Sequence, residues 1–489
     1  MNNELILAFD IGTSSVRAAL YDADAEVIPQ TFVKNERHLS ETDDGGAEID
    51  PGEAIAQVVK AIDDVIGKSA GIDGSITMST ASCFWHSLVG IDDTGEPTTN
   101  VYAWGEKRPA RFVGELRGTL DESAVHNRTG AQFHSSFWPA KLLWLKDEQP
   151  ENYKRTARWI SFSDLVALKL FGTRTTSVSM ASATGIFDQR RCDWDPELLD
   201  FLDLTRENLA PIADTDDATF RLTEDYARRW PRLAETRWLP AIGDGAANNL
   251  GAGCDSGDKA ALMIGTSGAM RVVFEGEVPE RIPFGLWCYR VDRRRLIIGG
   301  ALSDGGGLFR WLKDNLRLSG TDDEVEAEIG RREPDAHGLT FLPFLFGERS
   351  TGYHENARGA ILGLQSTTDS IDIVQAGLES VAYRFAEIFD RLNEVCKIKE
   401  IIASGGALRE SPVWTQIIAD VLGRDMFLPD TREASSRGAV VFALGLSNRP
   451  HDSKAPDGTR FEFDTMRRIT YLRSRGRHRH FYDTLTSAS

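Results

Sequence analysis

The stretch Ala8-Phe9-Asp10-Ile11-Gly12-Thr13-Ser14-Ser15-Val16-Arg17 begins as an apolar strand, breaks at Gly-Thr-Ser and returns to apolar residues. The same pattern comes back in the second half of the chain as Met263-Ile264-Gly265-Thr266-Ser267-Gly268-Ala269-Met270-Arg271. Glycine lets a backbone approach a ligand closely, and successive N–H groups in such a turn form a nest that binds anions. Two such loops predict two related domains that hold a polyphosphate from opposite sides, as in a nucleotide-dependent phosphotransferase or ATPase.

Length and composition agree with two domains. The chain has 489 residues, whereas single hydrophobic cores stop growing at roughly 250–300 residues. Its net charge of −18 argues against a nucleic-acid partner, which requires a basic face. The N-terminus has no signal-peptide pattern, and no apolar run approaches the roughly 18 residues of a membrane span. The five cysteines include no CxxC pair, so we expect a reducing, cytoplasmic location.

Strands and helices alternate in both halves, which predicts an α/β architecture. We expect strands at 5–9, 16–20 and 75–79 and an amphipathic helix around Lys141-Leu142-Leu143-Trp144-Leu145. The domain boundary is predicted near 237–240, so that residues 1–238 form the first domain and residues 239–489 the second.

The second half gives the clearest local signals. Apolar residues at helical spacing follow Asp369, a favourable N-cap. A strand at 400–403 precedes the turn Ser404-Gly405-Gly406, and Ser411 begins the next helix. Glycines after strands, here Gly405, Gly406 and Gly305, can pack a nucleotide on bare backbone, or they can form ordinary strand-to-helix turns.

Two aspartates are candidates for chemistry. Asp10 ends a strand beside the first Gly-Thr-Ser loop, where a carboxylate would repel phosphate unless Mg²⁺ bridged them; the alternative is a turn aspartate. Asp244 lies between Gly243 and Gly245, glycines that we expect to let a substrate approach the backbone. It could accept a proton from a hydroxyl that attacks a γ-phosphate, or it could cap the following helix. The spacing leaves both alternatives open.

Aromatic and polar residues suggest a sugar site. Trp85-His86-Ser87 and Trp104-Gly105-Glu106-Lys107-Arg108 combine rings that stack on C–H faces with groups that bind hydroxyls; simple packing is the alternative. The arginines between 467 and 479 predict a solvated helix face. The sequence contains neither GxxxxGK[ST] nor a convincing GxGxxG after a strand.

Together these segments resemble the FGGY carbohydrate kinase family over nearly the whole chain. The similarity includes Asp10 to Arg17, Gly243-Asp244-Gly245, Gly265-Thr266-Ser267-Gly268, Phe346-Gly347-Glu348-Arg349-Ser350 with Asn356-Ala357-Arg358-Gly359-Ala360, and Ala403-Ser404-Gly405-Gly406-Ala407. Departures from the family pattern are Trp138, Gly377 and Glu106, the last in a segment where many members have Trp-x-Asp-x-Arg. This departure leaves open whether the 104–108 segment contacts the sugar.

The resemblance implies two actin-like (ribonuclease-H-like) domains, with ATP, Mg²⁺ and a sugar in the cleft between them. It makes Asp244 the catalytic base and substrate contact, and places Asp10 near the metal. The nucleotide would be bound by Gly12, Thr13, Ser14, Arg17, Gly265, Thr266, Ser267, Gly305, Gly405 and Gly406. The acceptor would be bound by Trp85, His86, Trp104 and His134.

Trp85-His86-Ser87-Leu88 and Thr129-Gly130 with His134 resemble the gluconate kinases of the family. Gluconate is therefore the expected substrate, with both histidines donating hydrogen bonds to its hydroxyls or carboxylate. A pentulose such as D-xylulose or D-ribulose is the alternative, and glycerol is disfavoured. A non-kinase actin-fold ATPase and an inactive sugar-binding regulator are alternatives of other classes. We expect no nucleic-acid or membrane partner, and a homodimer is compatible with the sequence.

Overall fold

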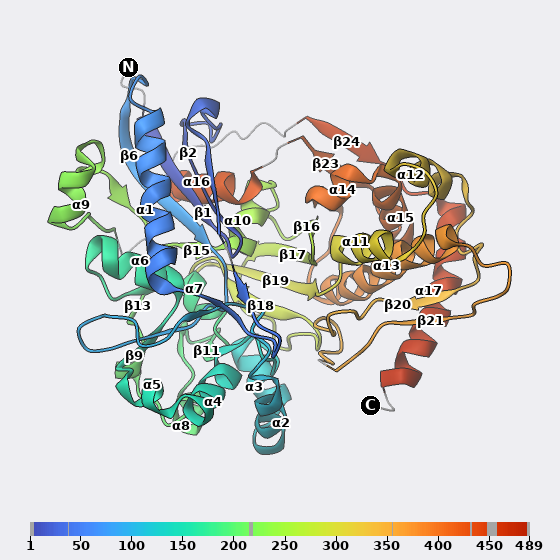
Figure 1. Cartoon of the computed structure of the whole chain (residues 1–489), viewed down its shortest axis with the longest axis horizontal. Helices are drawn as coiled ribbons and strands as arrows, with labels where there is room; N and C mark the ends of the chain where they lie inside the picture. Colours follow the sequence, from blue (N-terminus) through green and yellow to red (C-terminus); the bar gives the residue numbers. More distant parts are fainter. Residues whose placement is uncertain are drawn as a thin grey trace.

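The computed structural model describes residues 4–37, 39–214, 219–354, 356–430, 433–446 and 457–486. Figure 1 shows two α/β halves, the N-terminal one in blue to green and the C-terminal one in yellow to red. The first half is built on a sheet in the order β14-β6-β1-β2-β3, with β15 also paired to β6. Its strands are β1 (Glu4–Ile11), β2 (Ser15–Tyr21), β3 (Val33–Glu36), β6 (Ser75–Cys83), β14 (Arg237–Trp238) and β15 (Ile242–Gly243).

The second half repeats this pairing scheme. Its sheet has the order β18-β19-β17-β16-β22-β23-β24. In the first sheet β1 is antiparallel to β2 and parallel to β6, and in the second β16 is antiparallel to β17 and parallel to β22. The two Gly-Thr-Ser loops are the corresponding hairpin turns. The bounds are β16 (Lys259–Ile264), β17 (Gly268–Glu275), β18 (Trp287–Arg290), β19 (Arg295–Leu302), β22 (Glu400–Ser404), β23 (Met426–Pro429) and β24 (Gly458–Phe461).

Helices and short hairpins surround the sheets. In the first half the helices are α1 (Pro51–Lys68), α2 (Ala110–Thr119), α3 (Glu122–Thr129), α4 (Trp138–Glu148), α5 (Pro150–Arg155), α6 (Phe162–Phe171), α7 (Val178–Ser182), α8 (Pro196–Phe201) and α9 (Glu224–Arg229). The second half has α11 (Gly306–Asn315), α12 (Asp322–Arg331), α13 (Ser370–Val395), α14 (Gly406–Glu410), α15 (Pro412–Leu422) and α17 (Thr465–Thr486). Among the described residues, no helix combines the length and apolar character needed to cross a membrane.

The local signals of the second half predicted its helices well. Asp369 caps α13 by accepting the N–H of Asp372, and its own N–H is bound by the Asp372 side chain. Ser411 caps α15 through the N–H of Trp414, and Gly423 ends that helix in a left-handed conformation. These helices bury their apolar sides in one hydrophobic core of the second sheet.

A helix forms around residue 141 as predicted, but the prediction that it is amphipathic, with one exposed face, is wrong. The first half of α4 is buried on all sides, Lys141 included. The Lys141 ammonium donates to the carbonyls of His86 (2.7 Å) and Ala103 (2.8 Å). Burial lowers the pKa of Lys141 to about 7. A long side chain that reaches backbone carbonyls can be buried where its charge alone predicts exposure.

The strand that follows the predicted boundary, β15 (Ile242–Gly243), belongs to the first sheet. β15 pairs with β6, and α10 (Asp244–Gly251) follows it directly. The first strand of the second sheet, β16, begins at Lys259. We therefore propose that the first domain continues through α10, beyond the boundary predicted at residue 238.

Helix α16 (Ala434–Leu446) returns from the second half to the first sheet, where it packs on α10, β1 and β6. The two helices touch backbone to backbone. A Cβ on Gly251 would lie 1.8 Å from the Ala434 carbonyl oxygen, and one on Gly438 would lie 1.7 Å from that of Ala247. Only glycine allows this approach.

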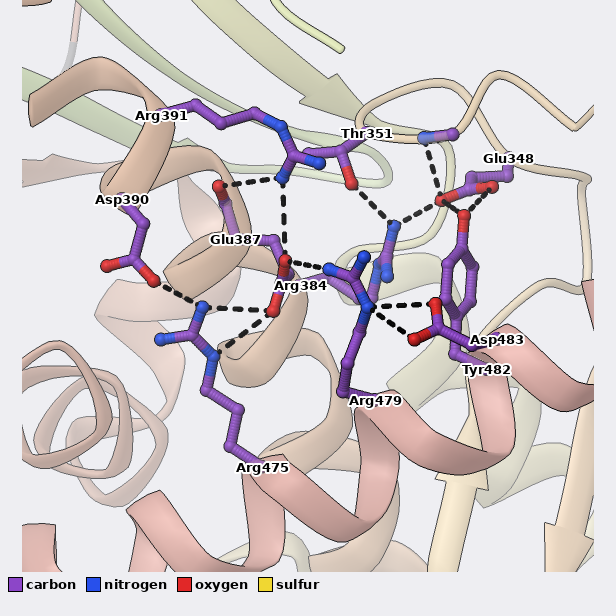
Figure 2. Close-up of polar contacts among 11 residues, drawn as sticks. Glu348, Thr351, Arg384, Glu387, Asp390, Arg391, Arg475, Arg479, Tyr482 and Asp483 are labelled. Atoms are coloured by element: carbon purple, nitrogen blue, oxygen red, sulfur yellow. Dashed lines mark hydrogen bonds and ion pairs between the residues drawn. The ribbon is translucent and has the colours of Figure 1, made fainter. Parts of the chain in front are cut away.

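The C-terminal arginines form a solvated face only in part: Arg473 and Arg479 are exposed, but others are held by acidic side chains. Arg475 binds Glu387 of α13 at 2.9 Å, and Arg477 binds Asp335 at 3.0 Å. Figure 2 shows Arg475 and Arg479 directed at the acidic side chains of α13. In a chain with so many carboxylates, a basic helix finds acidic partners within the same protein.

Candidate active site

A cavity of about 160 Å³ lies between the two halves and is lined by both. The residues predicted to bind the acceptor all line it: Trp85, His86, Trp104, His134 and Asp244. The second half contributes Ser267 of the second Gly-Thr-Ser loop, and also Arg271, Tyr289, Arg349 and Tyr353. Residues far apart in sequence thus converge on one cleft.

Asp244 occupies the first position of α10, and the cap is Gly243. Its Oδ1 accepts the N–H of Gly245 at 2.8 Å. Burial raises the pKa of Asp244 to about 6, although Arg271 lowers it, and the nearby Asp10 raises it further. A carboxylate with this pKa is ionised at neutral pH yet basic enough to accept a proton from a hydroxyl.

The glycines beside Asp244 serve a purpose other than the one we expected. A Cβ on Gly243 would lie 1.8 Å from the Trp85 ring, and one on Gly245 would lie 2.5 Å from it. The indole of Trp85 is 5% exposed, donates to the Ser179 carbonyl at 3.1 Å and packs edge-on against Trp287 and Tyr289. The glycines make room for this indole, so Trp85 forms the wall behind the base.

Both histidines are neutral. Burial lowers the pKa of His86 and of His134 to about 3. His86 Nδ1 faces the Ala183 carbonyl at 2.6 Å and so carries the ring proton, which leaves Nε2 as an acceptor. The Ser136 N–H donates to His134 Nδ1 at 3.1 Å, which places the His134 proton on Nε2. His86 therefore suits a donor such as a substrate hydroxyl, and neither ring supplies the cation that a carboxylate needs.

Two half-buried arginines were missed by the sequence analysis. Arg271 has no hydrogen-bond partner for Nε and Nη1, and Arg349 has none for Nε, among the residues that the structure describes. Both line the cavity. Arg271 is the last residue of the repeated loop pattern, and Arg349 lies in the Gly-Glu-Arg-Ser segment. Both residues were therefore part of motifs found in the sequence, but the sequence analysis assigned them no function.

The 104–108 segment divides between cavity and core. Trp104 lines the cavity, and the Arg349 guanidinium lies 5.1 Å from its ring centroid. Glu106 is fully buried and pairs with Arg108 at 2.7 Å, while Arg108 also pairs with Glu48. Neither Glu106 nor Arg108 lines the cavity, so of this segment Trp104 alone is placed to meet the acceptor.

The glycines predicted to hold the nucleotide surround the second Gly-Thr-Ser loop. Gly305 N donates to the Thr266 carbonyl at 3.1 Å, and Gly306 N to the Gly265 carbonyl at 2.8 Å. A Cβ on Gly305 would lie 2.8 Å from the Ser267 backbone, and one on Gly405 would lie 2.2 Å from the Ile264 carbonyl oxygen. Gly406 faces open space. Gly305 and Gly405 are therefore required by contacts within the protein, and of these three glycines Gly406 leaves its backbone open to a ligand.

The first Gly-Thr-Ser loop closes β1 and β2 through Gly12 N and the Ser15 carbonyl at 2.9 Å. Asp10, just before it, accepts from Arg17 at 3.1 Å and from Ser82 at 2.7 Å. Because Asp10 raises the pKa of Asp244, the two carboxylates lie near each other. Paired carboxylates beside a phosphate loop are the donor set that suits Mg²⁺.

Models of one protein family match most of the chain. The N-terminal domain of the FGGY family of carbohydrate kinases matches residues 5–251, and its C-terminal domain matches residues 260–445. The chain belongs to the FGGY family of carbohydrate kinases. It is a phosphotransferase of a family that uses ATP, and its predicted two-domain fold is confirmed. The non-kinase alternative is set aside.

Known FGGY kinases resemble it over nearly their full length. The gluconokinase of Bacillus subtilis (strain 168) is 27% identical over 452 residues, covering 90% of this chain and 87% of that protein. The xylulose kinase of Staphylococcus xylosus is 26% identical over 448 residues, with 90% of each covered. The gluconate kinase structure from Lactobacillus acidophilus has a TM-score of 0.91 at 24% identity, covering 99% of this chain and 98% of that one.

Proposed function

We propose that this FGGY kinase transfers the γ-phosphoryl group of ATP to a terminal hydroxyl of an open-chain sugar acid, D-gluconate. The observation that carries the proposal is the content of the cleft. A basic carboxylate, Asp244, shares one cavity with two half-buried arginines whose buried nitrogens have no hydrogen-bond partner among the described residues. In a protein of net charge −18, such cations favour an anionic acceptor. Relatives named gluconokinase support the same substrate.

In the proposed reaction Asp244 accepts the proton of the acceptor hydroxyl while its oxygen attacks the γ-phosphorus. The new O–P bond forms as the bond to the ADP oxygen breaks, and the proton on Asp244 then passes to solvent. Arg271 lies near Asp244, whose pKa it lowers, and is placed to neutralise charge on the transferred group.

The nucleotide would lie on Gly12, Thr13, Ser14 and Arg17 from one side and on the glycines around Thr266 from the other. Mg²⁺, when bound, supplies positive charge that neutralises the phosphates, and Asp10 would hold it. Closure of the two domains would exclude water as a competing acceptor.

A pentulose is the second candidate, because a relative is named xylulose kinase and the His86 Nε2 acceptor suits a hydroxyl. A coupled ADP-release assay over sugars, polyols and sugar acids separates the two. We expect the highest kcat/KM with D-gluconate. A kcat/KM for D-xylulose or D-ribulose at least tenfold above that for D-gluconate would reject the gluconate proposal and leave the kinase assignment intact.

A further inference from the structure

The loop of residues 346–354 turns two neighbouring charged side chains in different directions. Arg349 lines the cleft, whereas Glu348 is directed at α13 and α17, as Figure 2 shows. Glu348 forms an ion pair with Arg384 in which both side chains are 1% exposed. The Tyr482 hydroxyl lies 3.0 and 2.8 Å from the two Glu348 oxygens. The carboxylate of Glu348 is thus held by the last helix of the described chain.

The same loop is fixed to the second sheet around Arg349. Ser350 N donates to the Ala301 carbonyl at 3.0 Å, and Ala301 N donates to Ser350 Oγ at 3.0 Å. Tyr353 N donates to the Arg349 carbonyl at 2.7 Å. The backbone on both sides of Arg349 therefore has defined partners. Glu348 links the loop to α13 and α17, and Thr351 adds a second contact to α13 by accepting from Arg384 at 3.3 Å.

Arg349 lines the cavity, and its Nε has no hydrogen-bond partner among the described residues. A second nitrogen, Nη2, donates to the Leu302 carbonyl at 3.0 Å, and the indole of Trp104 lies against the guanidinium. Among the described residues no carboxylate forms an ion pair with it. A buried guanidinium with remaining donors binds carboxylates through two parallel hydrogen bonds.

Arg271 occupies a different part of the cleft. A Cβ on Gly245, the residue after Asp244, would lie 3.1 Å from Arg271 Nε, whereas the Arg349 guanidinium lies 5.1 Å from the ring centroid of Trp104. Arg271 therefore belongs to the reacting end, near the base, and Arg349 to the end where the histidines and Trp104 lie. An acceptor with its hydroxyl at Asp244 would direct its other end towards Arg349.

Resting on the proposed function, we infer that Arg349 is the specificity-determining residue that binds the carboxylate of the sugar acid. Glu348, Arg384 and Tyr482 are its positioning residues, so that the C-terminal helix contributes to acceptor choice.

The test compares gluconate with D-glucitol, which has the same carbon chain and a neutral hydroxymethyl group in place of the carboxylate. Calorimetry on the full chain measures both affinities for the wild type, Arg349→Met and Arg349→Lys. We expect Arg349→Met to weaken gluconate binding about a hundredfold and D-glucitol binding less than threefold, with Arg349→Lys restoring part of the difference. An equal loss for both ligands would overturn the role of Arg349 and leave the proposed function standing.

Wild-type turnover keeps the two proposals separate. If the wild type phosphorylates a neutral pentulose in preference to gluconate, the proposed function fails and the inference fails with it. If gluconate is preferred, the arginine variants alone decide the inference.

Tyr482→Phe tests the positioning residues, because it removes one hydroxyl from the Glu348 pair. We expect gluconate affinity to fall about threefold to tenfold, with the KM for ATP and the affinity for D-glucitol unchanged. Arg477→Gln is the matched control on the same helix, since Arg477 contacts Asp335, Thr340 and Leu339 and not Glu348. Equal gluconate affinities in Tyr482→Phe and Arg477→Gln would refute the role of the C-terminal helix.

Discussion

Replacing Asp244 by Asn should abolish catalysis and stabilise the protein. The change keeps the size of the side chain and removes the base, a loss that costs about 10²–10⁴-fold in kcat, or roughly 3–5 kcal/mol of barrier. Folding responds in the opposite direction, because the native state penalises the ionised carboxylate. The pKa of Asp244 rises from 3.8 to about 6. At about 1.4 kcal/mol per pKa unit, this difference corresponds to roughly 3 kcal/mol at pH 8.

The sign of the pH dependence follows from the raised pKa. Between pH 4 and 6 the native state holds a proton that the unfolded state has lost, so the wild-type stability falls as the pH rises through this window. Above pH 6 the full penalty is present, and Asn, which is neutral, escapes it. The variant should therefore melt several degrees above the wild type at pH 8 and about equally at pH 4.

Thermal melts at both pH values, with a chelator present so that no cation binds the carboxylates, measure the stability effect. Steady-state turnover measures the catalytic effect, and wild-type kcat/KM should fall tenfold per pH unit below pH 6. A variant that keeps more than about a tenth of the wild-type kcat would show that Asp244 is not the base. Equal melting temperatures at pH 8 would show that burial of this charge does not oppose folding.

Three further predictions concern the nucleotide and acceptor sites. Gly265→Val should raise the KM for ATP and leave acceptor affinity unchanged. A Cβ at this position meets nothing nearer than Met263 Sδ at 3.8 Å, so the new side chain fills only the space expected for phosphate. Unchanged calorimetric binding of an ATP analogue would contradict this prediction. Gly405→Ala should instead lower the melting temperature, since Gly405 has φ +100° and a Cβ would lie 2.2 Å from the Ile264 carbonyl oxygen; a melt equal to the wild type would refute it. His86→Ala should weaken gluconate turnover without changing the KM for ATP, and because the pKa of His86 is about 3, kinetics between pH 5 and 8 should show the same pH dependence of the gluconate KM in the variant and the wild type.

The fold could be predicted from sequence because its signals are local. The repeated Gly-Thr-Ser hairpin corresponds to a repeated strand order, and Asp369 and Ser411 cap the helices that they precede. The exposure of individual side chains was harder to predict. Lys141 is buried because its ammonium reaches carbonyls of two segments that are distant in the sequence.

The cleft was predicted in part for the same reason. Trp85, His86 and Asp244 lie in short motifs that the sequence shows directly. The roles of Arg271 and Arg349 depend on which residues surround them in the fold, and on their lack of acidic ion-pair partners among the described residues. The glycines beside Asp244 were assigned to the substrate because the sequence does not show that an indole from another strand's end fills that space.

The contact between α10 and α16 joins a helix from the second half of the chain to the first half. With Gly251 and Gly438 letting one backbone lie directly on the other, α16 anchors the second half of the chain on the first sheet, where it also packs on β1 and β6. A methyl group at either glycine would meet the facing backbone and force the two helices apart, although neither glycine lines the cleft. We therefore expect a substitution there to alter how the two parts of the chain are joined while leaving the cleft residues unchanged.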